Sequence, residues 1–465
     1  MTALSIQPRH LPRLHSDFVP AVLWRRAYEK KVSSDRRSVP ITLALERRSG
    51  DISHWSTRVL SSSPENDAFT IRYLERALKF LLWQKGGHRI YFAGPEFLAQ
   101  ALQQIYSAEG ARQFDSKFIG EKVYGAPLSI ATVSRDLIPA EAESQAALGR
   151  NWKGCRIGFD LGGSDRKCAA VIDGEVVFSE EIPWDPYFQK DPNYHFEGIQ
   201  DSLRRAAEKL PRIDAIGGSA AGIYVDNEPR VGSLFRGVNE DEFARQIRPL
   251  FKRLRSAWGD VPFEVINDGE VTALAGAIAL QENAVLGISL GTSQAVGFVN
   301  PQGNITTWLN ELAFAPVDYA ANAPRDEWSG DIGCGVQYFS QQAVARLAPR
   351  AGIDFPEEMP FADRLIAVQE RMQAGDFAAQ AIYETIGTYL GYTIAHYADF
   401  YDFRHLLLLG RVTSGAGGKW IMSQARHVLQ DEFPEIDQKV AFVIPDEKQK
   451  RHGQAVTAAS LPALP

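Results

Sequence analysis

Glycine-rich turns that follow apolar strands occur in this chain, and turns of this kind can hold phosphate oxygens. The first lies in "GFDLGGSD", where a strand ends at Asp160 and runs into Gly162, Gly163 and Ser164. Glycines at a hairpin tip allow backbone N–H groups to approach phosphate closely, and an acid beside them can hold hydrated Mg²⁺. Gly-Gly is also typical of ordinary hairpin turns, so this motif by itself leaves both interpretations open.

A second turn has the same layout. In "LGTSQAVGFV" a strand precedes Gly291, Thr292 and Ser293, and another strand follows. Two hairpins of this form in one chain suggest two lobes that close on one polyphosphate from opposite sides. The pair is therefore far more specific than either turn alone.

A third motif places an acid between a strand and a helix. In "VPFEVINDGEVTALAGA" the apolar strand ends at Asn267 and Asp268. A carboxylate there can accept a proton from a hydroxyl that attacks a phosphoryl group. Asp and Asn are also the usual helix N-caps, so catalysis and capping both remain interpretations of this pair.

The elements that must position these residues alternate between strands and helices. Residues 41–60 predict two strands around a Ser-Gly-Asp turn, and a helix is expected next because Ile71, Leu74, Leu78 and Leu81 recur at helical spacing. A strand (88–94), a second helix (96–107) and a linker (136–152) are predicted after it. A similar order recurs from 155 to 225, which suggests a degenerate internal repeat whose first copy lacks the glycines.

The remaining sequence continues the alternation. It predicts one helix at 241–258, with Arg and Lys on its outer face, then a long apolar helix at 376–400 and a strand at 405–410. Strands and helices in this order indicate an α/β class.

Composition excludes several classes of protein. The 465 residues have a net charge of −7, which argues against nucleic acid as a main partner. The three cysteines do not form a C-x-x-C pair, and their sparse number fits a reducing compartment. No apolar run approaches the roughly 20 residues of a membrane span, and the N-terminus does not resemble a signal peptide. We therefore expect a cytoplasmic protein.

The order of the motifs resembles that of the ROK family (repressors, open reading frames and sugar kinases). The first hairpin, "GGSAAGIYVDN", "VINDGEVTALAGA", the second hairpin and "LLLLGRVTSGAGG" follow one another as in that family, over about residues 155–460. The resemblance implies a two-lobe actin-like (ribonuclease H-like) ATPase or hexokinase fold. It implies kinase lobes at 151–284 and 285–465, preceded by an extra N-terminal α/β domain and linker at 1–150.

The resemblance also implies roles for individual residues. Asp268 matches the catalytic base, and Asp160 would hold Mg²⁺ through water. Residues that match the substrate-binding positions are Asn267, Glu311, Ser219 and Gly222. Those that match the nucleotide-binding and phosphate-binding positions are Asp160, Gly162, Gly163, Ser164, Gly291, Thr292, Ser293, Gly410, Ser414 and Gly415.

Three departures from the family pattern affect these implications. Phe314 stands where the family has a histidine that contacts the sugar, and Arg411 replaces a glycine of the adenosine turn. The cysteine-rich zinc loop retains only Cys334. One thiol cannot form a closed four-ligand site, so the sequence predicts no structural zinc there.

The resemblance implies ATP- and Mg²⁺-dependent phosphorylation of a sugar or polyol hydroxyl, with Asp268 as general base. The alternative is a sugar-binding regulator or degenerate kinase that has this fold without turnover. The first 150 residues do not show the compact three-helix pattern of a DNA-binding domain. A homodimer is the default expectation for the oligomeric state.

Overall fold

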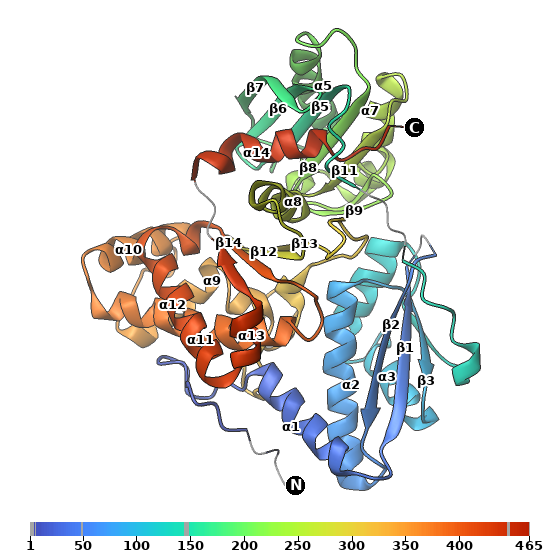
Figure 1. The fold of residues 1–465 in the computed structure, drawn as a ribbon, viewed down its shortest axis with the longest axis vertical. Helices are drawn as coiled ribbons and strands as arrows, with labels where there is room; N and C mark the ends of the chain where they lie inside the picture. Colours follow the sequence, from blue (N-terminus) through green and yellow to red (C-terminus); the bar gives the residue numbers. More distant parts are fainter. Residues whose placement is uncertain (1–3, 5, 48–49, 144–147, 444–446, 465) are drawn as a thin grey trace.

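The computed structural model consists of three bodies around a common centre (Figure 1). It describes residues 4, 6–47, 50–143, 148–443 and 447–464. An upper lobe (green) lies above a lower lobe (orange and red) and an N-terminal body (blue). Within the described ranges, no helix combines the length and apolar character needed to cross a membrane.

A four-stranded sheet and a long helix, α2, form the N-terminal body. The strand order is β2-β1-β3-β4. Ser63 caps α2 by accepting a hydrogen bond from the Asn66 N–H, and Pro64 starts the helix, where a missing N–H is tolerated. The strands and helices predicted between 41 and 107 are confirmed. The elements are α1 (Ala21–Ser34), β1 (Val39–Glu46), β2 (Ile52–Val59), α2 (Pro64–Gln84), β3 (Arg89–Ala93), α3 (Glu96–Ile105), α4 (Gln113–Asp115), a π-helical turn (Ser116–Tyr124) and β4 (Ser129–Thr132).

The order of elements that suggested a repeat is present, but the strand pairing differs. In the N-terminal body β1 and β3 are antiparallel. Their counterparts in the upper lobe, β5 (Cys155–Leu161) and β8 (Ala215–Ala220), are parallel. The two segments therefore share an order of elements without sharing a topology.

The upper lobe contains a five-stranded sheet in the order β11-β8-β5-β6-β7. Helix α14 (Glu447–Ala459), near the end of the chain, returns from the lower lobe and packs on this sheet (Figure 1). An added Cβ on Gly158 or Gly217 would lie within 1.8 Å of a backbone oxygen of α14, so these glycines permit the close packing. The other elements are β6 (Asp165–Ile172), β7 (Glu175–Pro183), α5 (Pro192–Ala207), β9 (Ile223–Val225), β10 (Glu228–Val231), α6 (Glu240–Glu242), α7 (Leu250–Ala257), β11 (Phe263–Asn267) and α8 (Asp268–Leu280).

The lower lobe has a four-stranded sheet in the order β13-β12-β14-β15, covered by helices. The second hairpin, the long apolar helix and the strand predicted at 405–410 are confirmed here. The elements are β12 (Val285–Leu290), β13 (Gln294–Val299), α9 (Gln341–Leu347), α10 (Phe361–Gln373), α11 (Phe377–Tyr397), β14 (His405–Leu409), α12 (Gly415–Glu432), α13 (Pro434–Lys439) and β15 (Ala441–Val443).

The prediction of one continuous helix at 241–258 is wrong. The segment forms the short α6, a π-helical turn (Phe243–Ile247) and then α7. Pro249 precedes α7, and a proline inside a helix removes a hydrogen bond and clashes with the preceding turn. Leu250 and Leu254 are buried, so the predicted inward face is retained.

The predicted linker, 136–152, is tied to the N-terminal body before residue 144. The Ala142 N–H donates to the Ile52 carbonyl over 3.0 Å, next to the start of β2. Residues 144–147 of this linker, and 48–49 of the predicted N-terminal turn, lie outside the described residues.

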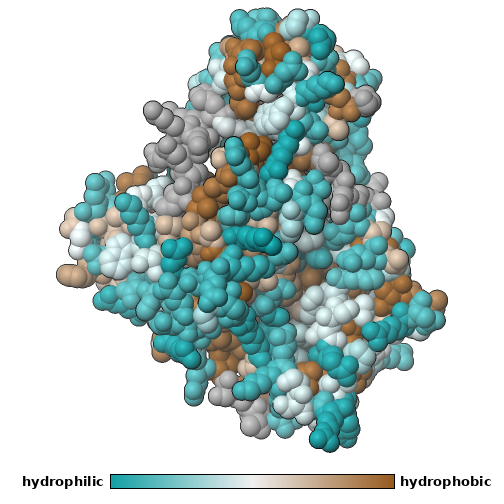
Figure 2. Space-filling view, in the orientation of Figure 1, coloured by the Kyte–Doolittle hydropathy of each residue, from teal (hydrophilic) through white to brown (hydrophobic). Residues whose placement is uncertain are grey.

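The N-terminal body and the lower lobe share one continuous apolar core, whereas most of the upper lobe packs around its own. On the face shown in Figure 2, hydrophilic residues predominate over both lower bodies, and hydrophobic ones form small patches. Apolar side chains of both bodies are therefore buried where the two bodies meet. The N-terminal body is thus packed directly against the lower lobe.

Charged groups are also buried where these two bodies meet. Lys79 of α2 is fully buried, and its Nζ lies 3.0 Å from Oδ1 of Asp115 and 2.8 Å from Oδ2 of Asp331 in the lower lobe. Burial alone would lower the pKa of Lys79, but the carboxylate of Asp115 and its neighbours raise it overall. The lysine therefore stays charged and links α2 to the lower lobe.

Candidate active site

Polar residues predicted for the site lie at the carboxyl ends of three parallel strands of the upper lobe. Asp160 on β5 is in register with Ser219 on β8, which is in register with Ile266 on β11. The Ser219 hydroxyl donates to Oδ1 of Asp160 over 2.6 Å. Ligands of open α/β sheets usually bind outside this edge, so the fold places these residues where a ligand site is expected.

The helix cap at the end of β11 is Asn267. Its Oδ1 accepts a hydrogen bond from the Gly269 N–H over 2.7 Å, and its Nδ2 donates to the Gly222 carbonyl over 2.7 Å. Asp268 is the first residue of α8, and its Oδ1 lies 3.0 Å from the same Gly269 nitrogen. The capping function that the sequence left open thus belongs to Asn267.

Asp268 and Glu311 form a pair of acids with perturbed pKa values. Burial raises the pKa of Asp268 to about 6, and the nearby Asp160 carboxylate adds to the rise. Burial likewise raises the pKa of Glu311 to about 7, with a further contribution from Asp268. No cation among the described residues offsets either shift. A carboxylate with a pKa this close to neutrality is suited to accept a proton.

Asn310 connects the Glu311 loop to helix α8. Its Nδ2 donates a short hydrogen bond to the Glu270 carboxylate, and its Oδ1 accepts from the Tyr401 hydroxyl over 2.7 Å. Its φ of 52° lies in the left-handed region, which asparagine tolerates better than most residues. Asn310 therefore fixes the loop against α8, two residues beyond Asp268.

The N-terminal body also supports this loop. The Asn310 N–H donates to the Gln84 carbonyl and the Glu311 N–H to the Trp83 carbonyl, each over 2.9 Å. These carbonyls belong to the last turn of α2, where the helix itself supplies no partner. The end of α2 thus positions the backbone of Glu311. The sequence carried no signal for this contact because every residue type has the same carbonyl group.

The first hairpin tip is closed by its own hydrogen bonds. The Gly162 N–H donates to the Asp165 carbonyl over 2.9 Å, and the Ser164 hydroxyl lies 2.9 Å from Oδ2 of Asp165. At Gly163 an added Cβ would lie 1.9 Å from the Tyr187 hydroxyl. Local packing thus explains Gly163, and the Gly162 N–H is used within the turn.

Lys167 is a cation beside this tip that the sequence motifs did not single out. Its Nζ lies 2.7 Å from Oδ1 of Asp165 and 3.5 Å from Oδ2 of Asp160. This ion pair accounts for Asp165, which otherwise adds an unexplained negative charge to a tip expected to hold phosphate.

The second hairpin tip lies against the predicted adenosine turn. Thr292 and Ser293 are exposed, and the Gly291 N–H donates to the Ser293 carbonyl over 2.9 Å. Gly410 has a φ of 93°, and an added Cβ would lie 2.3 Å from the Leu290 carbonyl oxygen. The tertiary structure therefore brings the ends of β12 and β14 together.

The rest of the adenosine turn leads into α12. Ser414 precedes the helix without forming a side-chain cap, and Gly415 starts it with a φ of 67° and open space around it. Arg411 is exposed, and its carbonyl accepts from the Gln369 side chain over 2.7 Å. Arg411 can therefore stand in place of a glycine without being forced into the core.

Phe314 belongs to an aromatic cluster between the lower lobe and the N-terminal body. Its ring centre lies 4.5 Å from that of Trp83 and 5.2 Å from that of Trp328. An aromatic side chain fits these surroundings, which explains the difference from the family's histidine in packing terms.

Cys334 is buried near the Lys79 ion pairs. Its Sγ lies 3.8 Å from Oδ2 of Asp331, and burial raises the pKa of the thiol to about 12. A protonated thiol beside a buried ammonium group is a poor metal ligand, because the thiolate is the form that binds metal.

Two lobes with a hairpin tip in each, and an acid at the sheet edge, define an α/β fold of the actin and hexokinase-like class. Solved structures match it. A ROK hexokinase from Thermus thermophilus is 18% identical, with 66% of this chain and 97% of that chain covered and a TM-score of 0.50. A ROK family glucokinase from Streptomyces griseus, in complex with glucose and AMPPNP, is 20% identical, with coverage of 66% and 99% and a TM-score of 0.50.

A regulator has the same fold. A ROK family transcriptional regulator, a homologue of the E. coli MLC protein, is 18% identical, with 67% of this chain and 78% of that chain covered and a TM-score of 0.53. No protein-family model and no curated protein matches the sequence. The ROK-type, hexokinase-like α/β fold predicted from the sequence is thus confirmed over about two thirds of the chain.

Proposed function

We propose that this protein transfers a phosphoryl group from ATP to a hydroxyl of a sugar or sugar-like polyol. The observation that carries the proposal is Asp268. It stands at the carboxyl edge of the upper sheet, has no cationic partner among the described residues, and has a pKa of about 6. Asn267 caps the helix, and Asp268 uses Oδ1 on the Gly269 N–H, so its Oδ2 is left for a ligand.

In the proposed mechanism Asp268 accepts the proton of the attacking hydroxyl and orients its oxygen. General bases of this kind contribute about 10²–10⁴-fold. Glu311 accepts hydrogen bonds from neighbouring hydroxyls. Asn267 uses its Oδ1 in the cap and one N–H on Gly222, so its second amide N–H is left for the acceptor. Closure of the lobes would exclude water, which competes as a phosphoryl acceptor.

The nucleotide would lie between the two hairpin tips. Exposed Thr292 and Ser293 on one tip and the Lys167 ammonium on the other offer donors for phosphate oxygens. Carboxylate oxygens are the ligands Mg²⁺ prefers, but Asp160 is 4% exposed and already contacts Ser219 and Lys167. It fits a metal held through water. When bound, Mg²⁺ would neutralise phosphate charge.

A sugar-binding regulator without turnover is the second candidate, and Asp165 is the observation that favours it. Its carboxylate contacts both Ser164 and Lys167 at the tip. A negative charge there disfavours phosphate, and Asp165 competes with the nucleotide for both donors.

The test is a phosphotransfer screen with ATP and Mg²⁺ over hexoses, amino sugars, N-acyl sugars and polyols. We expect one class to be phosphorylated, and Asp268→Asn to lower its kcat/KM by about 10²–10⁴-fold. Asp260→Asn, on an exposed turn, is the matched control and should have no effect. If every acceptor fails although sugar binding is measurable, the regulator is the correct reading. Full activity of Asp268→Asn would refute Asp268 as the base.

A further inference from the structure

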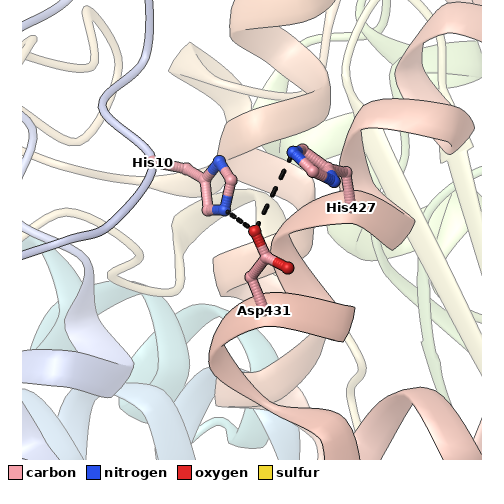
Figure 3. A group of neighbouring side chains, drawn as sticks. All are labelled: His10, His427 and Asp431. Carbon is pink, nitrogen blue, oxygen red and sulfur yellow. Dashed lines mark hydrogen bonds and ion pairs between the residues drawn. The ribbon is translucent and has the colours of Figure 1, made fainter.

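Two histidines and an aspartate meet on the surface of the lower lobe, at the end of α12 opposite the predicted adenosine turn (Figure 3). Nε2 of His10 lies 2.8 Å from Oδ2 of Asp431, and Nε2 of His427 lies 3.9 Å from the same oxygen. The two imidazole rings meet edge to face, with centres 4.7 Å apart. Both imidazoles therefore approach one carboxylate oxygen, His10 from the N-terminal segment and His427 from the neighbouring turn of α12.

The backbone holds these three side chains in place. His427 and Asp431 are four residues apart on α12, so they lie on the same face of the helix. His10 comes from the N-terminal segment that crosses this face, as Figure 3 shows. Its N–H donates to the Tyr392 hydroxyl over 3.2 Å, and the N–H of Arg9 donates to the Glu432 carboxylate over 2.5 Å.

We propose that His10, His427 and Asp431 bind a divalent transition-metal ion of the Zn²⁺ class. Imidazole nitrogen and carboxylate oxygen are ligands of such ions, at about 2.0–2.2 Å for zinc. The three ligand atoms lie within 4.8 Å of one another, so small side-chain rotations bring them around one ion. The Arg9 guanidinium donates to the backbone carbonyl of Asp431, which leaves the carboxylate for the metal.

The bound ion clips the N-terminal segment to the lower lobe. Helix α12 is 18 residues long and starts at Gly415 in the adenosine turn, so about 25 Å separates this site from the nucleotide end of the helix. The site is therefore independent of the proposed kinase chemistry, and its tests need no activity.

The first test is calorimetric titration of the full-length, chelator-treated protein with ZnCl₂. A separate sample of the chelator-treated protein is titrated with CoCl₂, and the absorption of the bound Co²⁺ is recorded. We expect one ion per chain, and at least tenfold weaker binding in His10→Ala and in His427→Ala. His405→Ala is the matched control, because His405 lies 3.8 Å from Glu282 and the described residues provide no third ligand beside this pair. Binding that is no tighter in the wild type than in a His10→Ala, His427→Ala double variant would overturn the site.

The second test measures whether the bound ion holds the N-terminal segment on α12. Trypsin cleavage after Arg9 and Arg13 is followed by mass spectrometry, with ZnCl₂ or with EDTA. If cleavage requires release of the segment, Zn²⁺ at 100 times its Kd slows it by about 100-fold. Equal cleavage rates in both conditions would overturn the clip, and slowing that persists in His427→Ala would show that the effect does not come from this site.

Discussion

Asp268→Asn is expected to stabilise the fold at pH 8 while it removes most phosphotransfer. The pKa of Asp268 rises from 3.8 to about 6 in the folded protein, so folding penalises the charged form. This difference of about two units corresponds to at most about 3 kcal/mol. Asparagine removes the charge, and its amide oxygen can still accept the hydrogen bond from Gly269.

The sign of the pH dependence follows from the direction of the shift. The penalty is fully present above about pH 6 and is lost as the pH falls through 6 towards 3.8, because the aspartate then becomes neutral in both states. The gain in the free energy of unfolding should therefore shrink from at most about 3 kcal/mol at pH 8 to about 1 kcal/mol at pH 4.5. Urea unfolding of both proteins at the two pH values measures it.

The pH dependence of kcat/KM tests the same carboxylate as a catalytic base. With the deprotonated Asp268 as base, wild-type kcat/KM should fall about tenfold per pH unit below about pH 6, and Asp268→Asn should lose this limb of the profile. Asp260→Asn should match the wild type in both stability and rate. A variant that is less stable than the wild type at pH 8, or that gains equally at both pH values, would contradict a half-buried Asp268 carboxylate whose charge is disfavoured by burial and by Asp160.

Three further changes test the framework around the site. Lys79→Met leaves the buried Asp115 carboxylate without its ammonium partner, and should lower the free energy of unfolding by about 3–5 kcal/mol in urea melts. An unchanged midpoint would mean that the cluster is not coupled to folding. Asn310→Ala removes the hydrogen bond to Glu270 that fixes the Glu311 loop, and should raise the KM for the acceptor about tenfold. The KM for ATP should stay within twofold of the wild type. Equal changes in both KM values would indicate a general structural defect. Gly217→Ala places a Cβ 1.7 Å from an α14 carbonyl and should cost about 1–3 kcal/mol, whereas retained stability would contradict this close packing.

The sequence predicted the elements whose signals are local. The apolar strands that end in a glycine or an acid were located correctly, because alternation of apolar and polar residues shows which face of a strand is buried. Helices were located by the spacing of their apolar residues in the same way. The prediction of one helix at 241–258 was wrong because Pro249 interrupts the helix, although the helical spacing of apolar residues continues across it. Asn267 and Asp268 stayed ambiguous, since a cap and a base use the same residue types and only the hydrogen bonds distinguish them.

The sequence by itself determined the class of fold, the two hairpins and the order of the motifs, because these depend on residue type and on short spacings. The tertiary structure decided which distant groups meet. The carbonyls of α2 support Glu311, Lys79 pairs with an acid more than 250 residues away, and His10 reaches α12. Such contacts depend on how packed bodies face one another, which no local pattern of side chains encodes.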